Sequence, residues 1–419
     1  MRITIPTALH KALDLVGTTI QKVTKLTKPQ LKFFVWLLER WWMLPVRYNF
    51  LTLSRFGGYS DRAIREQFAK PLPFVALFDA LYRPLQQKEC IVAFDPTFIP
   101  KSGKHTPGVY KFWNGSHQRA EKGLEAGVLA LIDVEDHMAY HIEATQTEVK
   151  TAEPAPEGVA AEEQGNKGTM EQYAHMITSH TVMLQQYSTV IVVDGYFMKQ
   201  GFIDALTTAG FQVVTKGRRD ASLKYLYHGK QSGVGHPRWY SGKVNLQKID
   251  KRRWKQCYQD KEITAYEVVV YSVSLKRKVK AVYVASEKEK GYELLISTDV
   301  TMAGDKVLQY YRLRFQIEFL IRDAKQYAGL EQCQARSTEK LYNHWNMALF
   351  SVSLARWQWW AKLPDNQKQD TAFSMRSVKT ACLNQYMAAT IFSILGLDMS
   401  SKKVKALFNQ CLNIGSIAA

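Results

Sequence analysis

The amino-acid sequence predicts a mixed α/β fold, and three observations support that class. Residues 90–99 and 188–197 are short runs rich in Val and Ile, which is typical of buried strands. A helix-patterned stretch, 170–186, separates them, so strands alternate with helices along the chain. Hydrophobic residues make up 46% of the 419 residues and charged residues 22%, which supplies a sizeable core and excludes a disordered chain or a small disulfide scaffold.

The charge balance indicates the class of partner. Lys and Arg number 56 against 38 Asp and Glu, so the net charge is +18. An excess of this size indicates a polyanionic partner, and nucleic acid is the commonest. The five cysteines have neither CxxC nor zinc spacing, which fits unpaired thiols in a reducing compartment. The most apolar stretch, residues 33–46, is too short to cross a bilayer, so we expect a soluble, cytoplasmic protein with no membrane partner.

Residues 1–88 are predicted to form a helical region that binds DNA ends. Gly-Gly at 57–58 separates two short helices, and Ser60 is placed to cap the second one. A helix, a glycine turn and a second helix bearing exposed Arg62 and Arg65 suit a helix-turn-helix DNA reader. An ordinary helical hairpin is an equal alternative, because this pattern is loose and common.

The rest of the chain divides into three predicted parts. Residues 89–217 and 301–362 together form an α/β core, which residues 218–300 interrupt with short strands and polar turns. Residues 363–419 form a C-terminal helical region. The interrupting segment contains 18 Lys and Arg against nine Asp and Glu, so it supplies half of the net charge. We therefore describe it as a basic β-rich insertion.

A cluster within the insertion combines cations with an aromatic ring. Its members are Lys251, Arg252, Arg253, Trp254 and Lys255. Such interleaving suits contacts to a DNA backbone together with base stacking. The alternative is a solvated turn without a ligand.

Three acidic residues are candidates for chemistry. Asp95 and Asp194 each follow a Val- and Ile-rich run, so both are expected at the carboxyl edge of the sheet, where ligands bind in α/β layers. Glu318 lies in a predicted helix. At 100° per residue, it shares one face of that helix with four other polar residues, namely Tyr311, Arg314, Arg322 and Lys325. The apolar stripe, formed by Leu313, Ile317, Leu320 and Ala324, lies on another face. The alternative for the polar face is a solvated surface with Arg314–Glu318–Arg322 ion pairs.

The spacing Tyr311-x2-Arg314-x3-Glu318-x6-Lys325 resembles the YREK signature of bacterial insertion-sequence transposases of the insertion-sequence-four family, which have a DDE active site. The order of Asp95, Asp194, a β-rich insertion and then the Glu318 helix is similar as well. The resemblance covers residues 90 to about 345 well and the N-terminal helices more loosely. It implies an RNase H-like catalytic core that the β-rich insertion interrupts.

The resemblance also implies roles for these residues. Asp95, Asp194 and Glu318 match the family's metal-binding catalytic carboxylates, which hold two Mg²⁺ ions that Mn²⁺ can replace. Tyr311, Arg314 and Lys325 match positions that contact the backbone of the transposon end. Family members also stack a tryptophan of the insertion on a displaced base, for which Trp239 and Trp254 are candidates.

The activity that the resemblance implies is cleavage at the ends of an insertion sequence and joining of the 3′-OH ends to target DNA. The partners are double-stranded DNA, as terminal inverted repeats and target, and a second copy of the chain in a synaptic complex at the bacterial nucleoid. Phosphodiester hydrolysis by two hard cations held on carboxylate oxygens agrees with these residue types. An RNase H-like nuclease without strand transfer and a catalytically inactive DNA-binding relative remain alternatives.

Overall fold

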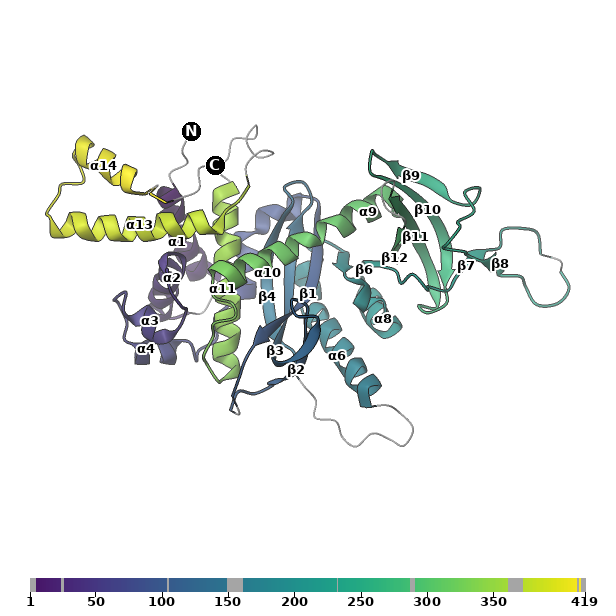
Figure 1. Ribbon diagram of the computed structural model, residues 1–419, viewed down its shortest axis with the longest axis horizontal. Helices are drawn as coiled ribbons and strands as arrows, with labels where there is room; N and C mark the ends of the chain where they lie inside the picture. The colour runs from purple at the N-terminus through teal and green to yellow at the C-terminus, as the bar shows by residue number, and fades with distance from the viewer. Residues whose placement is uncertain are drawn as a thin grey trace.

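The computed structural model in Figure 1 describes residues 5–23, 26–103, 105–148, 161–231, 233–286, 291–360, 372–412 and 414–415. The expected boundary between residues 362 and 363 lies outside these ranges. The predicted mixed α/β class is confirmed, since a sheet of twelve strands is flanked by helices. The N-terminal helices lie at one end of the molecule with α13 and α14, and strands β7–β11 lie at the other end (Figure 1).

The N-terminal region is helical, as its apolar spacing predicts. Its elements are α1 (Ile5–Val23), α2 (Lys28–Met43), α3 (Phe50–Ser54), α4 (Asp61–Gln67), α5 (Phe74–Leu81) and η1 (Arg83–Gln87). Ser60 caps α4 by accepting a hydrogen bond from the Ala63 amide, which confirms the predicted helix start. Gly57 has a φ of 76°, a left-handed conformation that favours glycine in the turn between α3 and α4.

The first part of the sheet combines antiparallel and parallel strands. Its elements are β1 (Cys90–Pro100), β2 (Tyr110–Asn114), β3 (Arg119–Asp133), β4 (Met138–Gln146), β5 (Val190–Val193) and β6 (Gln212–Lys216). Strand β3 pairs antiparallel with β1, β2 and β4, whereas β5 runs parallel to both β1 and β6. The helical elements α6 (Ala161–Thr178), α7 (Thr181–Leu184), η2 (Gly195–Phe197) and α8 (Gln200–Thr208) connect these strands.

The insertion extends the same sheet and does not form a separate one. Its strands are β7 (Leu223–Leu226), β8 (Tyr240–Lys243), β9 (Lys255–Gln259), β10 (Ile263–Ser272), β11 (Arg277–Ser286) and β12 (Tyr292–Ser297). Strand β12 pairs antiparallel with β6, where Leu295 lies opposite Lys216. Hydrogen bonding therefore continues from the core strands into the basic segment.

The helices after the insertion cover the core. They are α9 (Gly304–Leu313), α10 (Phe315–Tyr327), α11 (Thr338–Trp360), α13 (Met375–Ile394) and α14 (Lys402–Leu412). Helix α10 packs against β1, β4 and α11, and its predicted apolar stripe is buried. A buried ion pair of 2.7 Å between Asp323 and Arg356 fixes α10 to α11. Among the described residues, we find no helix long and apolar enough to span a membrane.

Candidate active site

Asp95 lies in the middle of β1, whereas the sequence predicted that it would end the strand. Strand β1 continues through Pro96, which has no backbone N–H to donate. This is tolerated because β5 pairs only with Val92 and Ala93, so no hydrogen bond to β5 is lost at Pro96. The expectation for Asp194 is correct, since it directly follows β5. Val92 pairs with Ile191, and continuing this register brings Asp95 level with Asp194. Level residues of neighbouring parallel strands lie side by side, so the two carboxylates are neighbours where the parallel pairing ends.

Helices α9 and α10 bring Tyr311 and Arg314 to these acids. Arg314 joins the two helices with helical backbone angles, φ −50° and ψ −36°, so the chain passes from one helix to the next without reversing. The Tyr311 hydroxyl donates to Oδ1 of Asp194 over 3.4 Å. Tyr311 and Arg314 are each only 6% exposed, which contradicts the alternative of a solvated surface at these two positions. This part of the face is covered because it rests against the acid-bearing strands.

The electrostatics show that all three acids share one environment. Burial raises the pKa of Asp95 to about 7; the Arg314 charge opposes this shift, and the Glu318 and Asp194 carboxylates add to it. Burial disfavours the charge of Arg314, but Glu318, Tyr311, Asp95 and Asp194 outweigh that effect and raise its pKa. A divalent cation would relieve the mutual repulsion of these carboxylates.

Glu318 is paired with Arg314. Its Oε1 lies 2.8 Å from Nη2 of Arg314, the first of the two i, i+4 ion pairs that the sequence allows. Arg322 is bonded to neighbouring Asp323 over 3.2 Å and does not form the second. Within the described ranges, no group of three or more His, Cys, Asp or Glu side chains is close enough to hold a metal ion as placed. The donor chemistry of the three carboxylates nevertheless fits hard divalent cations such as Mg²⁺, provided that Glu318 leaves Arg314.

Lys325, the last residue of the signature, is bound within the protein. Its Nζ donates to the Phe98 carbonyl over 2.9 Å and lies 2.8 Å from Oε1 of Glu331. It therefore connects α10 both to β1 and to the loop that follows α10. Arg322 is more accessible, with 55% of its side chain exposed.

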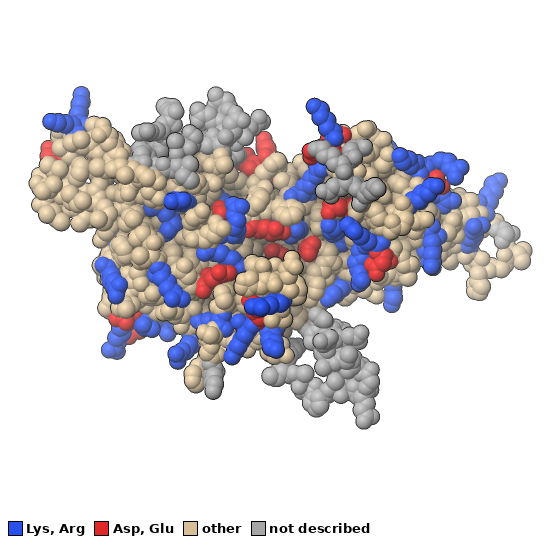
Figure 2. Space-filling model, in the orientation of Figure 1, with Lys and Arg blue, Asp and Glu red and all other residues tan. Residues whose placement is uncertain are grey.

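The basic cluster of the insertion is only partly available to a ligand. Lys251, Arg252, Arg253 and Lys255 are exposed. Trp254, predicted as a DNA-stacking residue, is only 3% exposed and donates to the Tyr225 hydroxyl over 3.0 Å. This corrects the expectation, because a buried ring offers no face to a base. Trp239, in contrast, is 68% exposed. Figure 2 shows Lys and Arg atoms spread over the surface of the end of the molecule that β7–β11 form.

Arg62 and Arg65, the candidate DNA-reading residues of the N-terminal region, both lie on the surface of α4. Arg62 pairs with Glu66 at 3.0 Å and Arg65 with Asp61 at 3.5 Å. Surface pairs of this kind contribute little to stability. Arg65 also lies over the Phe50 ring at 5.3 Å, so Arg62 is the more available of the two cations.

Glu125 of β3 is a further acid near Asp95, and no motif in the sequence predicted it. This carboxylate is 9% exposed, accepts hydrogen bonds from the Tyr173 hydroxyl and from Thr147 Oγ1, and contributes to the raised pKa of Asp95. Burial raises the pKa of Glu125 itself. The signal in the sequence was a single charged residue inside an otherwise apolar run, residues 123–132.

Comparison with known proteins assigns the family. The family model described as the transposase DDE domain matches residues 86–354, which is more than half of the chain and includes all three candidate acids. Comparison with curated proteins gave no match. The matched range begins just before β1 and ends within α11, so it contains the acid-bearing strands, the insertion and helices α9 and α10. On this match, the chain belongs to the DDE transposase family.

Proposed function

We propose that this protein is an insertion-sequence transposase of the insertion-sequence-four family, which cleaves DNA at the ends of its own element and joins the 3′-OH ends to target DNA. The observation that carries the proposal is the position of Arg314, buried beside Glu318 and close enough to Asp95 and Asp194 to influence both. The acids around Arg314 keep it charged despite its burial, and a buried cluster of interacting charges of this kind is typical of a site for a charged ligand.

The strand pattern supports an RNase H-like core. Three antiparallel strands, β4, β3 and β1, are followed across the sheet by the parallel strands β5 and β6. We assign residues 89–217 and 301–362 to this core, 218–300 to the insertion, 1–88 to DNA-end binding and 363–419 to a C-terminal helical region.

Asp95, Asp194 and Glu318 would hold two Mg²⁺ ions, which Mn²⁺ can replace. When bound, such ions supply an activated water and stabilise the leaving 3′ oxygen. The Tyr311 hydroxyl orients the Asp194 carboxylate through its hydrogen bond. When Glu318 turns from Arg314 toward a cation, the Arg314 guanidinium becomes available for a DNA phosphate and would hold the strand in line for attack.

The partners follow from this activity. Terminal inverted repeats and target DNA are the substrates, and the bacterial nucleoid is the place of action. Two ends must be held together for joining, so we propose a homodimer within a synaptic complex.

The test uses purified protein with a plasmid that carries the inverted repeats flanking the reading frame. In Mg²⁺, the wild type should release the element and join it to a second plasmid. Asp95→Asn, Asp194→Asn and Glu318→Gln should each lower cleavage by at least about three orders of magnitude, because several kcal/mol of charge stabilisation would be lost. Cleavage at the wild-type rate by any of the three would refute the assignment.

Two alternatives give different outcomes in the same assay. A nuclease without strand transfer would cut the plasmid but yield no joined product. A catalytically inactive DNA-binding relative would retain the repeats in a gel shift and leave them intact in Mg²⁺ and in Mn²⁺.

A further inference from the structure

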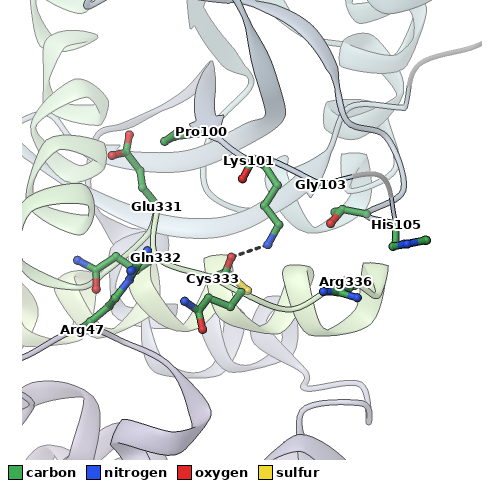
Figure 3. A pocket seen from close by; sticks show the side chains of 12 residues that line it. Arg47, Pro100, Lys101, Gly103, His105, Glu331, Gln332, Cys333 and Arg336 are labelled. Atoms are coloured by element: carbon green, nitrogen blue, oxygen red, sulfur yellow. Dashed lines mark hydrogen bonds between the residues drawn. The ribbon is translucent and has the colours of Figure 1, made fainter.

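A polar cavity of about 270 Å³ lies where three distant segments of the chain meet. Arg47 belongs to the loop after α2, Lys101 follows the last residue of β1, and Arg336 belongs to the loop between α10 and α11. Figure 3 shows Lys101 pointing into the space between Arg47 on one side and Arg336 on the other.

The cavity contains more positive than negative charge. Among the described residues that line it, Glu331 is the one acid, and that carboxylate already pairs with Lys325 at 2.8 Å. Arg47 and Arg336 are exposed, and neither makes an ion pair or a hydrogen bond with the part of the chain that the structure describes. Two guanidinium groups thus face one cavity without a counter-charge from the protein.

Lys101 is fixed between the two arginines. Its Nζ donates to the carbonyl of Cys333 over 2.6 Å and to that of Ala335 over 2.9 Å, which leaves one of its three N–H groups for a ligand. Burial lowers the pKa of Lys101, and the charge of Arg336 contributes to that shift. Like charges that disfavour one another in this way are stabilised by an anion between them.

The walls of the cavity are held in place. Next to Arg47, the Tyr48 amide donates to Oε1 of Gln332 over 2.8 Å, and the Tyr48 hydroxyl donates to the Tyr327 carbonyl over 2.8 Å. Gly329 has a φ of 67°, and a Cβ there would approach the Tyr48 ring to 2.3 Å. The loop after α2, which contains Arg47, is therefore packed closely onto the loop after α10, which contains Arg336, and this packing fixes the separation of the two arginines.

Strand β1 and Lys325 link the walls of the cavity to the candidate active site. Strand β1 runs from Asp95 through Phe98 to Pro100, which lines the cavity; five residues of a strand span about 16 Å. Lys325 joins Phe98 to Glu331 on the other wall. A duplex places one phosphate of each strand every ~3.4 Å along its axis, so this distance corresponds to roughly five nucleotides.

We propose that this cavity binds a backbone phosphate of the DNA strand, roughly five nucleotides from the phosphate at the candidate active site. The inference rests on the proposed function, because it takes DNA as the ligand. Two arginines on either side of a lysine suit a phosphodiester, whose oxygens accept paired N–H donors. Because β1 leads from Asp95 to the cavity, a DNA strand that continues from the active site is favoured over a free anion as the ligand.

The test compares the double variant Arg47→Gln, Arg336→Gln with the wild type. Affinity for a 30-base-pair duplex is measured by fluorescence anisotropy across a salt series without divalent metal. Loss of the contact to this one phosphate should reduce the slope of log affinity against log salt by about one, with an affinity ~10–100-fold lower at the lowest salt. Arg376→Gln, which removes an exposed arginine of α13 in the C-terminal helical region, should leave the slope unchanged.

Controls separate a contact from a structural role. The double variant Arg47→Lys, Arg336→Lys retains both charges and should keep most of the slope. Thermal melting should be unchanged for all variants, because both side chains are exposed. A wild-type slope in the Gln double variant would overturn the proposal, as would micromolar binding of inorganic phosphate that both Gln substitutions abolish without altering the DNA slope.

The outcomes also separate this inference from the proposed function. If the wild type cuts and joins DNA while the Gln double variant binds like the wild type, only the cavity is misassigned. If the wild type does not bind duplex DNA at all, both proposals fail.

Discussion

Nη2 of Arg314 lies 2.8 Å from Oε1 of Glu318, although the two residues are proposed to serve different ligands. One helical turn separates them, so each is the other's nearest counter-charge when neither DNA nor metal is bound. Arg314 is buried and Glu318 is partly exposed, at 7% and 39% of their side chains. The more exposed partner is thus the one that must turn toward a cation.

Substitutions at these two positions should separate DNA binding from chemistry. Arg314→Gln should weaken binding of an end-containing duplex by roughly 10–100-fold, since a charge-assisted phosphate contact contributes about 1.5–3 kcal/mol. Glu318→Gln should preserve that affinity and abolish cleavage. Gel-shift titration in Ca²⁺ and single-turnover cleavage in Mg²⁺ measure the two effects. Arg312→Gln, an exposed arginine two positions earlier, is the matched control; an equal loss there would make the Arg314 effect non-specific.

The raised pKa of Asp95 predicts a pH-dependent cost. Because its pKa is about 7 when folded and 3.8 in an unfolded chain, ionisation lowers the stability of the folded state as pH rises from about 4 to 7, and the cost is then constant. Asp95→Asn should therefore exceed the wild type in unfolding free energy by about 4 kcal/mol at pH 8 and by about 1–2 kcal/mol at pH 5. Urea unfolding at both pH values measures this.

The same pair of proteins tests metal binding without an activity assay. Mg²⁺ should raise the melting temperature of the wild type at pH 8 more than that of Asp95→Asn, because the cation replaces the missing counter-charge. Equal shifts in both proteins would mean that Asp95 is not a ligand.

Lys325 has two candidate roles with different consequences. If Lys325 serves as a structural bridge from Phe98 to Glu331, Lys325→Met should lower the unfolding free energy by about 1–2 kcal/mol. The salt dependence of DNA binding should then be unchanged. A double-mutant cycle with Glu331→Gln should show coupling between the two side chains. A reduced salt slope with unchanged stability would instead identify Lys325 as a phosphate contact.

The basic cluster of the insertion should contribute to DNA affinity through charge alone. Replacing Lys251, Arg252, Arg253 and Lys255 together with Gln should flatten the plot of log affinity against log salt by about two or more. Asp250 already pairs with Arg252 and Arg253 at 3.2 and 3.6 Å, so the loss should be smaller than four full contacts. An unchanged slope would place the cluster away from DNA.

The two tryptophans of the insertion should respond differently. Trp254→Ala should destabilise the fold by about 3–5 kcal/mol, because the ring is buried and bonded to Tyr225. Trp239→Ala should leave melting unchanged, because the ring is exposed. If Trp239 stacks on a base, it should quench 2-aminopurine in a cleaved-end duplex, and Trp239→Ala should lose that quenching. Loss of that quenching in Trp254→Ala alone, with normal melting, would reverse the assignment.

The sequence by itself determined the elements and the candidate chemistry. Periodicity located α10 and its buried stripe, from Ile317 to Ala324, because helix burial repeats every 3.6 residues. Composition located the basic insertion, and spacing placed Tyr311, Arg314 and Glu318 near one another; the single predicted helix is wrong, because the chain divides into α9 and α10 at Arg314. These features are local, so they can be predicted without knowing what packs against them.

The tertiary structure alone decided which groups meet. Asp95 comes level with Asp194 through strand register, and Lys101 comes near Arg47 and Arg336 through packing of segments far apart in sequence. Whether Trp254 is buried or exposed depends on the strands around it, since an aromatic beside four cations fits either state. Long-range pairing sets register and burial, and a linear pattern contains only the period of a face, not the partner that covers it.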